Sequence, residues 1–121
     1  CMNSKELEGR LKSLAYRIVN PCDALPKKKI SKVIEDQLLR SSFSAPANYR
    51  AACKAISKKA FVYKLSIAFE EADESLFWLE GIQELKLLPV EKLSAIIMEA
   101  NELASILAAA RKTTQANLKK S

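Results

Sequence analysis

Apolar residues recur every three or four positions along four long segments of this chain, and that spacing constrains the fold more than any other feature. It is the spacing of an amphipathic helix, which buries one apolar stripe. Only two glycines and four prolines interrupt the 121 residues, so the helices must be long. The pattern predicts an all-α fold, an antiparallel up-down-up-down four-helix bundle.

The prolines and one serine set the expected helix boundaries. The first helix covers residues 4–19 and should end before Pro21, because proline disfavours the helical conformation of the residue before it. The second covers residues 27–56, the third begins at the N-cap Ser57, and the fourth starts at Pro89. The expected core stripes are Leu7, Leu11, Leu14 and Ile18; Ile30, Val33, Ile34, Gln37, Leu38 and Ser41; Phe61, Leu65, Ala68, Ala72, Ser75, Leu76, Leu79 and Ile82; and Leu93, Ile96, Ala100, Leu103, Leu107 and Ala110.

Pro46 lies inside the second segment, yet small and apolar residues keep the helical spacing on both sides of it. A proline inside a helix cannot donate to the carbonyl four residues earlier, here Ser42, and therefore bends the helix. We expect one long helix that is kinked at Pro46, not two helices.

A chain of this length suits one domain with one core. We assign residues 2–116 to the four-helix-bundle domain and residues 117–121 to a basic, flexible tail.

Three cysteines cannot all pair within one chain, and no apolar run reaches the roughly 18 residues that span a bilayer. No basic segment followed by an apolar one resembles a secretory signal either. We expect reduced thiols in a cytoplasmic protein without membrane contact.

The chain has no histidine. Imidazole general bases, histidine-ligated metals and Ser-His or Cys-His nucleophile pairs are therefore excluded. We expect a protein that is not an enzyme and needs no metal or cofactor.

An acidic cluster in the third segment is the most chemical-looking feature. Three of its carboxylates share one helix face, as in a di-iron bundle, but that site also takes histidines. We interpret the cluster as a structural ion-pair network that fixes helix register, with Arg50 and Lys54 as further partners. Its expected members are Arg40, Glu70, Glu71, Asp73 and Glu74.

The net charge of +6 is unevenly distributed. Residues 1–69 carry 14 basic and 5 acidic side chains, whereas residues 70–102 carry 2 and 9. A basic half can attract nucleic acid; the alternative is a solvated surface. The candidate nucleic-acid-binding residues are Lys27, Lys28, Lys29, Lys32, Arg50, Lys54, Lys58 and Lys59.

A second apolar set lies off the core stripe of the third segment, at Phe69, Phe77 and Trp78. A helix that is apolar on more than one face is buried by more than its own bundle. We expect these residues at an oligomer interface; the alternative for the aromatic pair is stacking on bases.

The stretch QLLRS (37–41), APANYRAACKAISK (45–58) and KLSIAFEEADESLFWLE (64–80) strongly resembles the bacterial four-helix-bundle family named for proteins encoded in intervening sequences of 23S ribosomal RNA genes. Leu25–Pro26 and EANELASILAAARKT (99–113) fit its first joint and last helix. Many members show Asn-x-Ala-Glu-Gly after the proline. Here Tyr49, Arg50 and Ala51 follow Asn48, so a role of that Glu-Gly is not carried over.

The resemblance implies a ring-shaped homo-oligomer, typically a pentamer. A relative of the family, the accessory variability determinant of diversity-generating retroelements, is basic and works with a reverse transcriptase. Two hypotheses follow: a homo-oligomer that binds RNA, DNA or a ribonucleoprotein through its basic surface, and a protein–protein scaffold or accessory subunit without nucleic-acid contact.

Overall fold

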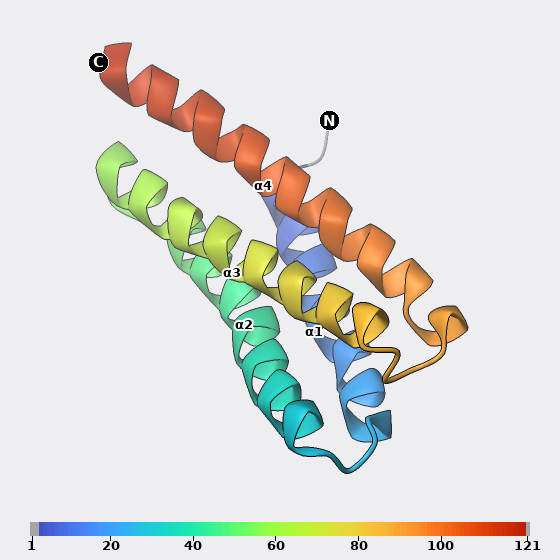
Figure 1. The fold of residues 1–121 in the computed structure, drawn as a ribbon. Coiled ribbons are helices and arrows are strands. Elements are labelled where there is room, and N and C mark those ends of the chain that lie inside the picture. The colour runs from blue at the N-terminus through green and yellow to red at the C-terminus, as the bar shows by residue number, and fades with distance from the viewer. Residues whose placement is uncertain (1–2, 121) are drawn as a thin grey trace.

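The structure, a computed structural model, describes residues 3–120. These residues form four α-helices, α1 (Ser4–Ala24), α2 (Lys29–Cys53), α3 (Lys58–Glu84) and α4 (Ser94–Lys120), with a short 3-10 helix η1 (Val90–Lys92) before the last (Figure 1). No helix in this described range is both long and apolar enough to span a bilayer. The predicted all-α class is confirmed.

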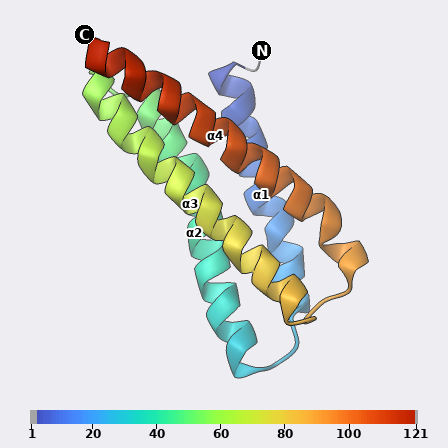
Figure 2. The same ribbon diagram turned by 45° about the horizontal axis from the view of Figure 1, so that its top comes forward.

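Consecutive helices run in opposite directions and pack side by side, α1 on α2, α2 on α3 and α3 on α4 (Figures 1 and 2). The contact of α1 with α4 closes the bundle and is the least extensive of the four. One end of the bundle holds the α1–α2 joint and the end of α3. The other end holds the start of α1, the α2–α3 joint and the end of α4.

The core consists of one apolar stripe from each helix, as the spacing predicts. The largest fully buried side chains are Leu11, Ile18, Ile34, Leu38, Leu65, Leu79, Ile82, Leu93, Leu103 and Leu107. Two residues of the expected stripe of α2 are placed wrongly. Ile30 and Val33 are 40% and 44% exposed, because Ser31 and Ile34 occupy the inward positions of this turn and rotate both side chains to its flank.

Pro21 does not end α1, contrary to the expectation. It lies buried within the helix, which continues to Ala24. The rule that proline restricts the preceding residue applies one turn later instead, at Leu25, which is extended (φ −62°, ψ 142°) before Pro26. Burial of Pro21 in the bundle offsets the hydrogen bond that it removes.

α2 passes through Pro46 without ending, as predicted, while the kink there stays a prediction. Polar side chains bond to the helix around the proline: Asn48 donates to the Ser44 carbonyl (3.0 Å), and the Ser41 hydroxyl donates to the Leu38 carbonyl (3.3 Å). Ser57 caps α3 as expected, because its hydroxyl accepts from the amide of Ala60 (3.0 Å).

α4 begins later than the predicted start at Pro89. The chain forms η1 after that proline and enters α4 only at Ser94. The helix then continues through Lys120, so residues 117–120, expected as tail, are helical. The predicted flexibility of this segment stays a prediction.

Candidate nucleic-acid interface

The eight candidate basic residues do not form one surface. Lys27, Lys28, Lys29 and Lys32 lie at the α1–α2 joint, and the other four lie at or beside the α2–α3 joint. Lys29 and Arg50 are 21 positions apart on α2, which separates the groups by roughly 32 Å. Sequence spacing could not show this division, because it depends on α2 running the full length of the bundle.

The group at the α1–α2 joint is partly neutralised. Lys32 Nζ pairs with the carboxylate of Asp36 (3.2 Å), and Glu35 lines the same shallow depression as the lysines. Lys28 occupies the N-cap position of α2 without a side-chain hydrogen bond, and the buried hydroxyl of Ser31 has no protein partner. The lysines oppose the positive end of the α2 dipole, so they do not stabilise the helix.

The second group lies at the α2–α3 joint, and we call it the basic end: Arg50, Lys54, Lys58 and Lys59. All four side chains are exposed. Arg50 and Lys54 lie at the C-terminus of α2, where the helix dipole favours a cation. Lys58 and Lys59 lie in the first turn of α3, where the dipole disfavours one. A purely structural role therefore accounts for the first pair but not for the second.

Two further lysines lie toward the same end of the bundle as the basic end, and the site prediction did not include them. Lys112 and Lys119 are exposed on the last turns of α4, which ends beside the start of α3 (Figures 1 and 2). The excess of positive charge in residues 103–121 was the available signal. These charges belong to a helix that finishes at the same end of the bundle as the α2–α3 joint (Figures 1 and 2).

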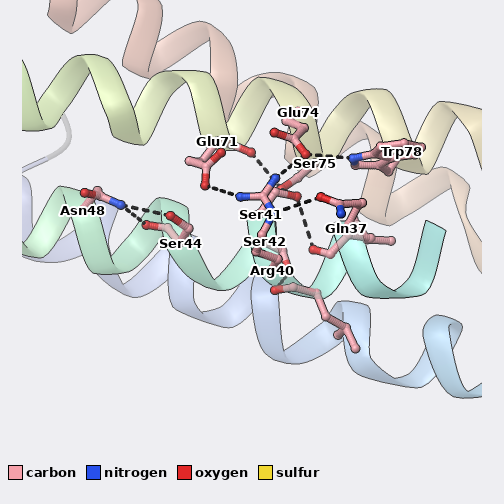
Figure 3. Close-up of polar contacts among 12 residues, drawn as sticks. Gln37, Arg40, Ser41, Ser42, Ser44, Asn48, Glu71, Glu74, Ser75 and Trp78 are labelled. Carbon is pink, nitrogen blue, oxygen red and sulfur yellow. Dashed lines mark hydrogen bonds and ion pairs between the residues drawn. The ribbon is translucent and has the colours of Figure 1, made fainter. Parts of the chain in front are cut away.

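The structure brings together three of the five residues of the expected ion-pair network (Figure 3). Arg40 on α2 contacts Glu71 (2.7 Å) and Glu74, both on α3. The indole of Trp78 donates to Glu74 (3.0 Å), and this bond, with Arg40 beside it, holds the pKa of Glu74 below its ordinary value. The network therefore links α2 to α3 near mid-bundle.

The remaining acidic residues of that prediction lie outside the network. Glu70 and Asp73 are exposed and make no ion pair among the described residues. Arg50 and Lys54, expected as further partners, lie at the basic end instead. Helical spacing placed the carboxylates on one side of α3, but only the two that face α2 meet an arginine.

A second ion-pair network was not predicted. Arg10 on α1 donates to Glu99 on α4 through Nε (2.9 Å) and Nη2 (2.6 Å), and it also contacts Glu102 (3.1 Å). The two-pronged contact lowers the pKa of Glu99. It joins the least extensive of the helix pairs, and its partners are 89 positions apart in the sequence.

No group of three or more histidine, cysteine or acidic residues that could hold a metal occurs within residues 3–120. Cys22 is buried, and burial raises the pKa of its thiol to about 12, so it stays protonated at neutral pH. Cys53 is exposed.

The three residues predicted at an oligomer interface differ in exposure. Phe69 is partly buried beneath the guanidinium of Arg111, 4.6 Å from the ring centroid, and Trp78 is partly buried against the core. Phe77 is 61% exposed and packs edge-on against Trp78, with centroids 5.0 Å apart. It lies toward the end of the α2–α3 pair where three further apolar residues are exposed, Ile30, Val33 and Leu85. We call Ile30, Val33, Phe77 and Leu85 the apolar face.

These features define the chain as an antiparallel four-helix bundle, and it belongs to the 23S rRNA-intervening sequence protein family, which matches residues 9–109. A similar solved structure is a protein of unknown function from the S23 ribosomal protein family of Bacteroides thetaiotaomicron. It is 32% identical, with a TM-score of 0.81, over 92% of this chain and 99% of that one. A comparison with curated proteins found no match.

Proposed function

We propose that this chain is a non-enzymatic, homo-oligomeric bundle that binds RNA, DNA or a ribonucleoprotein through its basic end. The observation that carries the proposal is the cluster of Arg50, Lys54, Lys58 and Lys59 at one joint. Two of its lysines oppose a helix dipole, which costs stability unless an anion is bound. Phosphate oxygens are the anions that such a cluster attracts in a nucleic acid.

The four residues of the basic end also differ from the other group in having no ion pair among the described residues, whereas one lysine of that group has one. Lys32 at the α1–α2 joint pairs with Asp36, and Glu35 lies beside that group, whereas no ion pair within the described range involves the four residues of the basic end. Charges that stay unpaired remain available for phosphates.

We also propose that the protein is cytoplasmic. The free, buried thiol of Cys22 supports this placement.

Charge reversal at each end tests the proposal. We expect Lys54→Glu, Lys58→Glu and Lys59→Glu together to weaken binding of a single-stranded RNA at least about tenfold at low salt. Each lost phosphate contact should reduce the slope of log affinity against log salt by about 0.7, so the three together by about 2. Fluorescence anisotropy across a salt series measures both quantities.

The matched control is the triple reversal of Lys27, Lys28 and Lys29 at the opposite end. It changes the net charge equally, so long-range attraction falls by the same amount in both variants. A larger loss of RNA affinity in the control variant would show that the binding site lies at the α1–α2 joint instead. Equal small losses would mean that the protein binds nucleic acid only through its overall charge.

The second candidate is a protein–protein scaffold or accessory subunit without nucleic-acid contact, and the exposed apolar face favours it. Native mass spectrometry of protein purified at low salt separates the two. An oligomer that carries nucleic acid, released by salt, supports the first. An oligomer that binds no added RNA or DNA supports the second candidate, the protein–protein scaffold.

We also propose that the oligomer is a closed ring, with a pentamer as the expected size, and that the apolar face contributes to its subunit contacts. Ring closure needs two different complementary surfaces on each subunit. Phe77 is the most exposed residue of this face, and its neighbour Trp78 fixes the orientation of its ring.

A further inference from the structure

An aromatic pair lies on the surface of the bundle, away from the apolar face. Tyr16 on α1 and Phe43 on α2 are 59% and 40% exposed, with ring centroids 5.9 Å apart and planes inclined at 52°. Both rings are stiff side chains with two rotatable bonds, and each supports the other. Together they expose apolar ring surface that the core does not use, on two rings that are tilted against each other.

The pair forms one end of a groove of about 170 Å³ between α1 and α2. Pro46, Ala15 and Ala47 also line it, and the small alanine side chains leave room between the two helices. Two cations, Lys12 on α1 and Arg50 on α2, line the same groove. Glu8 is its one acidic lining residue.

The groove leads to the basic end. Lys5 and Lys12 lie two turns apart on one side of α1, and Arg50 and Lys54 lie one turn apart on the adjoining side of α2. The 11 residues from Tyr16 back to Lys5 span about 16 Å along α1. A ligand that follows this path meets the aromatic rings first and then a series of cations.

We infer that this groove binds single-stranded nucleic acid, with a base stacked on Tyr16 or Phe43 and phosphates held by Lys12 and Arg50. The inference rests on the proposed function and makes it specific. Aromatic rings beside a cationic groove bind single strands with little sequence preference, because every base has a flat face. A duplex hides these faces, so it can use the cations but not the rings. Glu8 repels phosphate and limits the path to one side of the groove.

The test compares two aromatic substitutions with a matched control. Tyr16→Leu and Phe43→Leu remove the rings but keep apolar side chains on exposed positions, so the fold should remain. Tyr63→Leu is the control, because Tyr63 is exposed to a similar extent (64%) but lies on α3, away from the groove. Binding is measured by anisotropy with a single-stranded RNA of about twelve nucleotides, the equivalent DNA strand and a duplex of the same length.

We expect the double variant Tyr16→Leu, Phe43→Leu to bind both single strands about five- to tenfold more weakly, the lower range for stacking of one base. Binding of the duplex should change less than twofold, and Tyr63→Leu should bind all three probes like the wild type. Because stacking is uncharged, the salt slope of the double variant should equal that of the wild type. Photocrosslinking with 5-iodouridine should join the RNA to Tyr16 or Phe43.

The outcomes separate this inference from the proposal beneath it. Wild-type protein that binds none of the probes overturns both. Binding that is lost on reversal of Lys54, Lys58 and Lys59 but unchanged in the aromatic double variant overturns only the stacking site. Equal losses for single strands and duplex in the double variant would also overturn it. If the double variant loses affinity for only one of the two single strands, the stacking site is supported and that strand, RNA or DNA, is its ligand.

Discussion

Glu74 accepts hydrogen bonds from two side chains of different chemistry, the indole of Trp78 and the guanidinium of Arg40 (Figure 3). Beneath them the hydroxyl of Ser75 donates to that of Ser41 (3.0 Å), both fully shielded from solvent. The hydrogen bond between the two serines lies in the core. The ion pairs of Arg40 cover it at the edge of the core. Arg40 itself is nearly half exposed, so its ion pairs contribute less than about 1 kcal/mol each.

The lowered pKa of Glu74 makes stability depend on pH. Its folded-state pKa lies below the unfolded value, so its contribution is present above the unfolded value, near 4.3, and is lost as the pH falls through the folded one. We expect Glu74→Gln to reduce the acid-induced loss of unfolding free energy, measured by urea denaturation between about pH 5 and pH 2. The Glu74→Gln variant should still lose part of its unfolding free energy in acid, because the lowered pKa of Glu99 also contributes.

The control for this variant is Glu70→Gln, which removes an exposed carboxylate four residues earlier on α3 that makes no ion pair in the described structure. Its acid dependence should match the wild type. An unchanged slope in Glu74→Gln would mean that the hydrogen bonds of Glu74 do not persist in solution.

At the scale of the element, the turn that follows α3 contains a residue in a strained backbone conformation. Lys86 has φ 55°, in the left-handed region, where side chains other than glycine and asparagine are disfavoured. The turn is held because the amide of Leu87 bonds back to the carbonyl of Ile82 (3.0 Å), the pattern that closes many helix C-termini. This turn sends the chain across to α4.

We expect Lys86→Gly to stabilise the protein by about 0.5–1 kcal/mol, because glycine adopts the left-handed conformation without steric cost. Lys86→Ala removes the same charge and side chain but keeps the strain, so it should give no stabilisation. Thermal and chemical denaturation of the two variants measure the difference. Equal stability of both would show that the turn is not left-handed in solution.

On the scale of the whole molecule, the apolar face and the basic end use different parts of the α2–α3 pair. The apolar face lies toward the start of α2 and the end of α3, whereas the basic end lies at the joint between the two helices. The proposed subunit contact and the proposed nucleic-acid binding therefore use different residues. A ring that packs through the apolar face would leave the basic end of every subunit free, which raises avidity for one strand.

We expect Phe77→Glu to dissociate the oligomer, since a buried carboxylate without a partner costs several kcal/mol at an interface. Native mass spectrometry at micromolar concentration should then show mainly the monomer. Gln115→Glu adds the same charge at an exposed polar site of α4 and should leave the oligomer unchanged. An intact Phe77→Glu oligomer would place the subunit contact elsewhere.

The sequence by itself determined the helical class, the continuity of α2 through Pro46 and most of the core, because the period of apolar residues is a local property. It also determined the cap at Ser57, whose chemistry depends on the next three residues only. Its errors at Pro21 and Pro89 concern helix ends, where burial against other helices can outweigh a local preference.

Only the tertiary structure decided which charges meet. Whether a lysine of residues 27–32 lies near one of residues 54–59 depends on the length and direction of α2, and the two groups prove to lie at opposite ends. The pairing of Arg10 with Glu99 and the surface formed by Tyr16 and Phe43 likewise join residues far apart in sequence. Such contacts arise from packing between helices, which a periodic pattern does not encode.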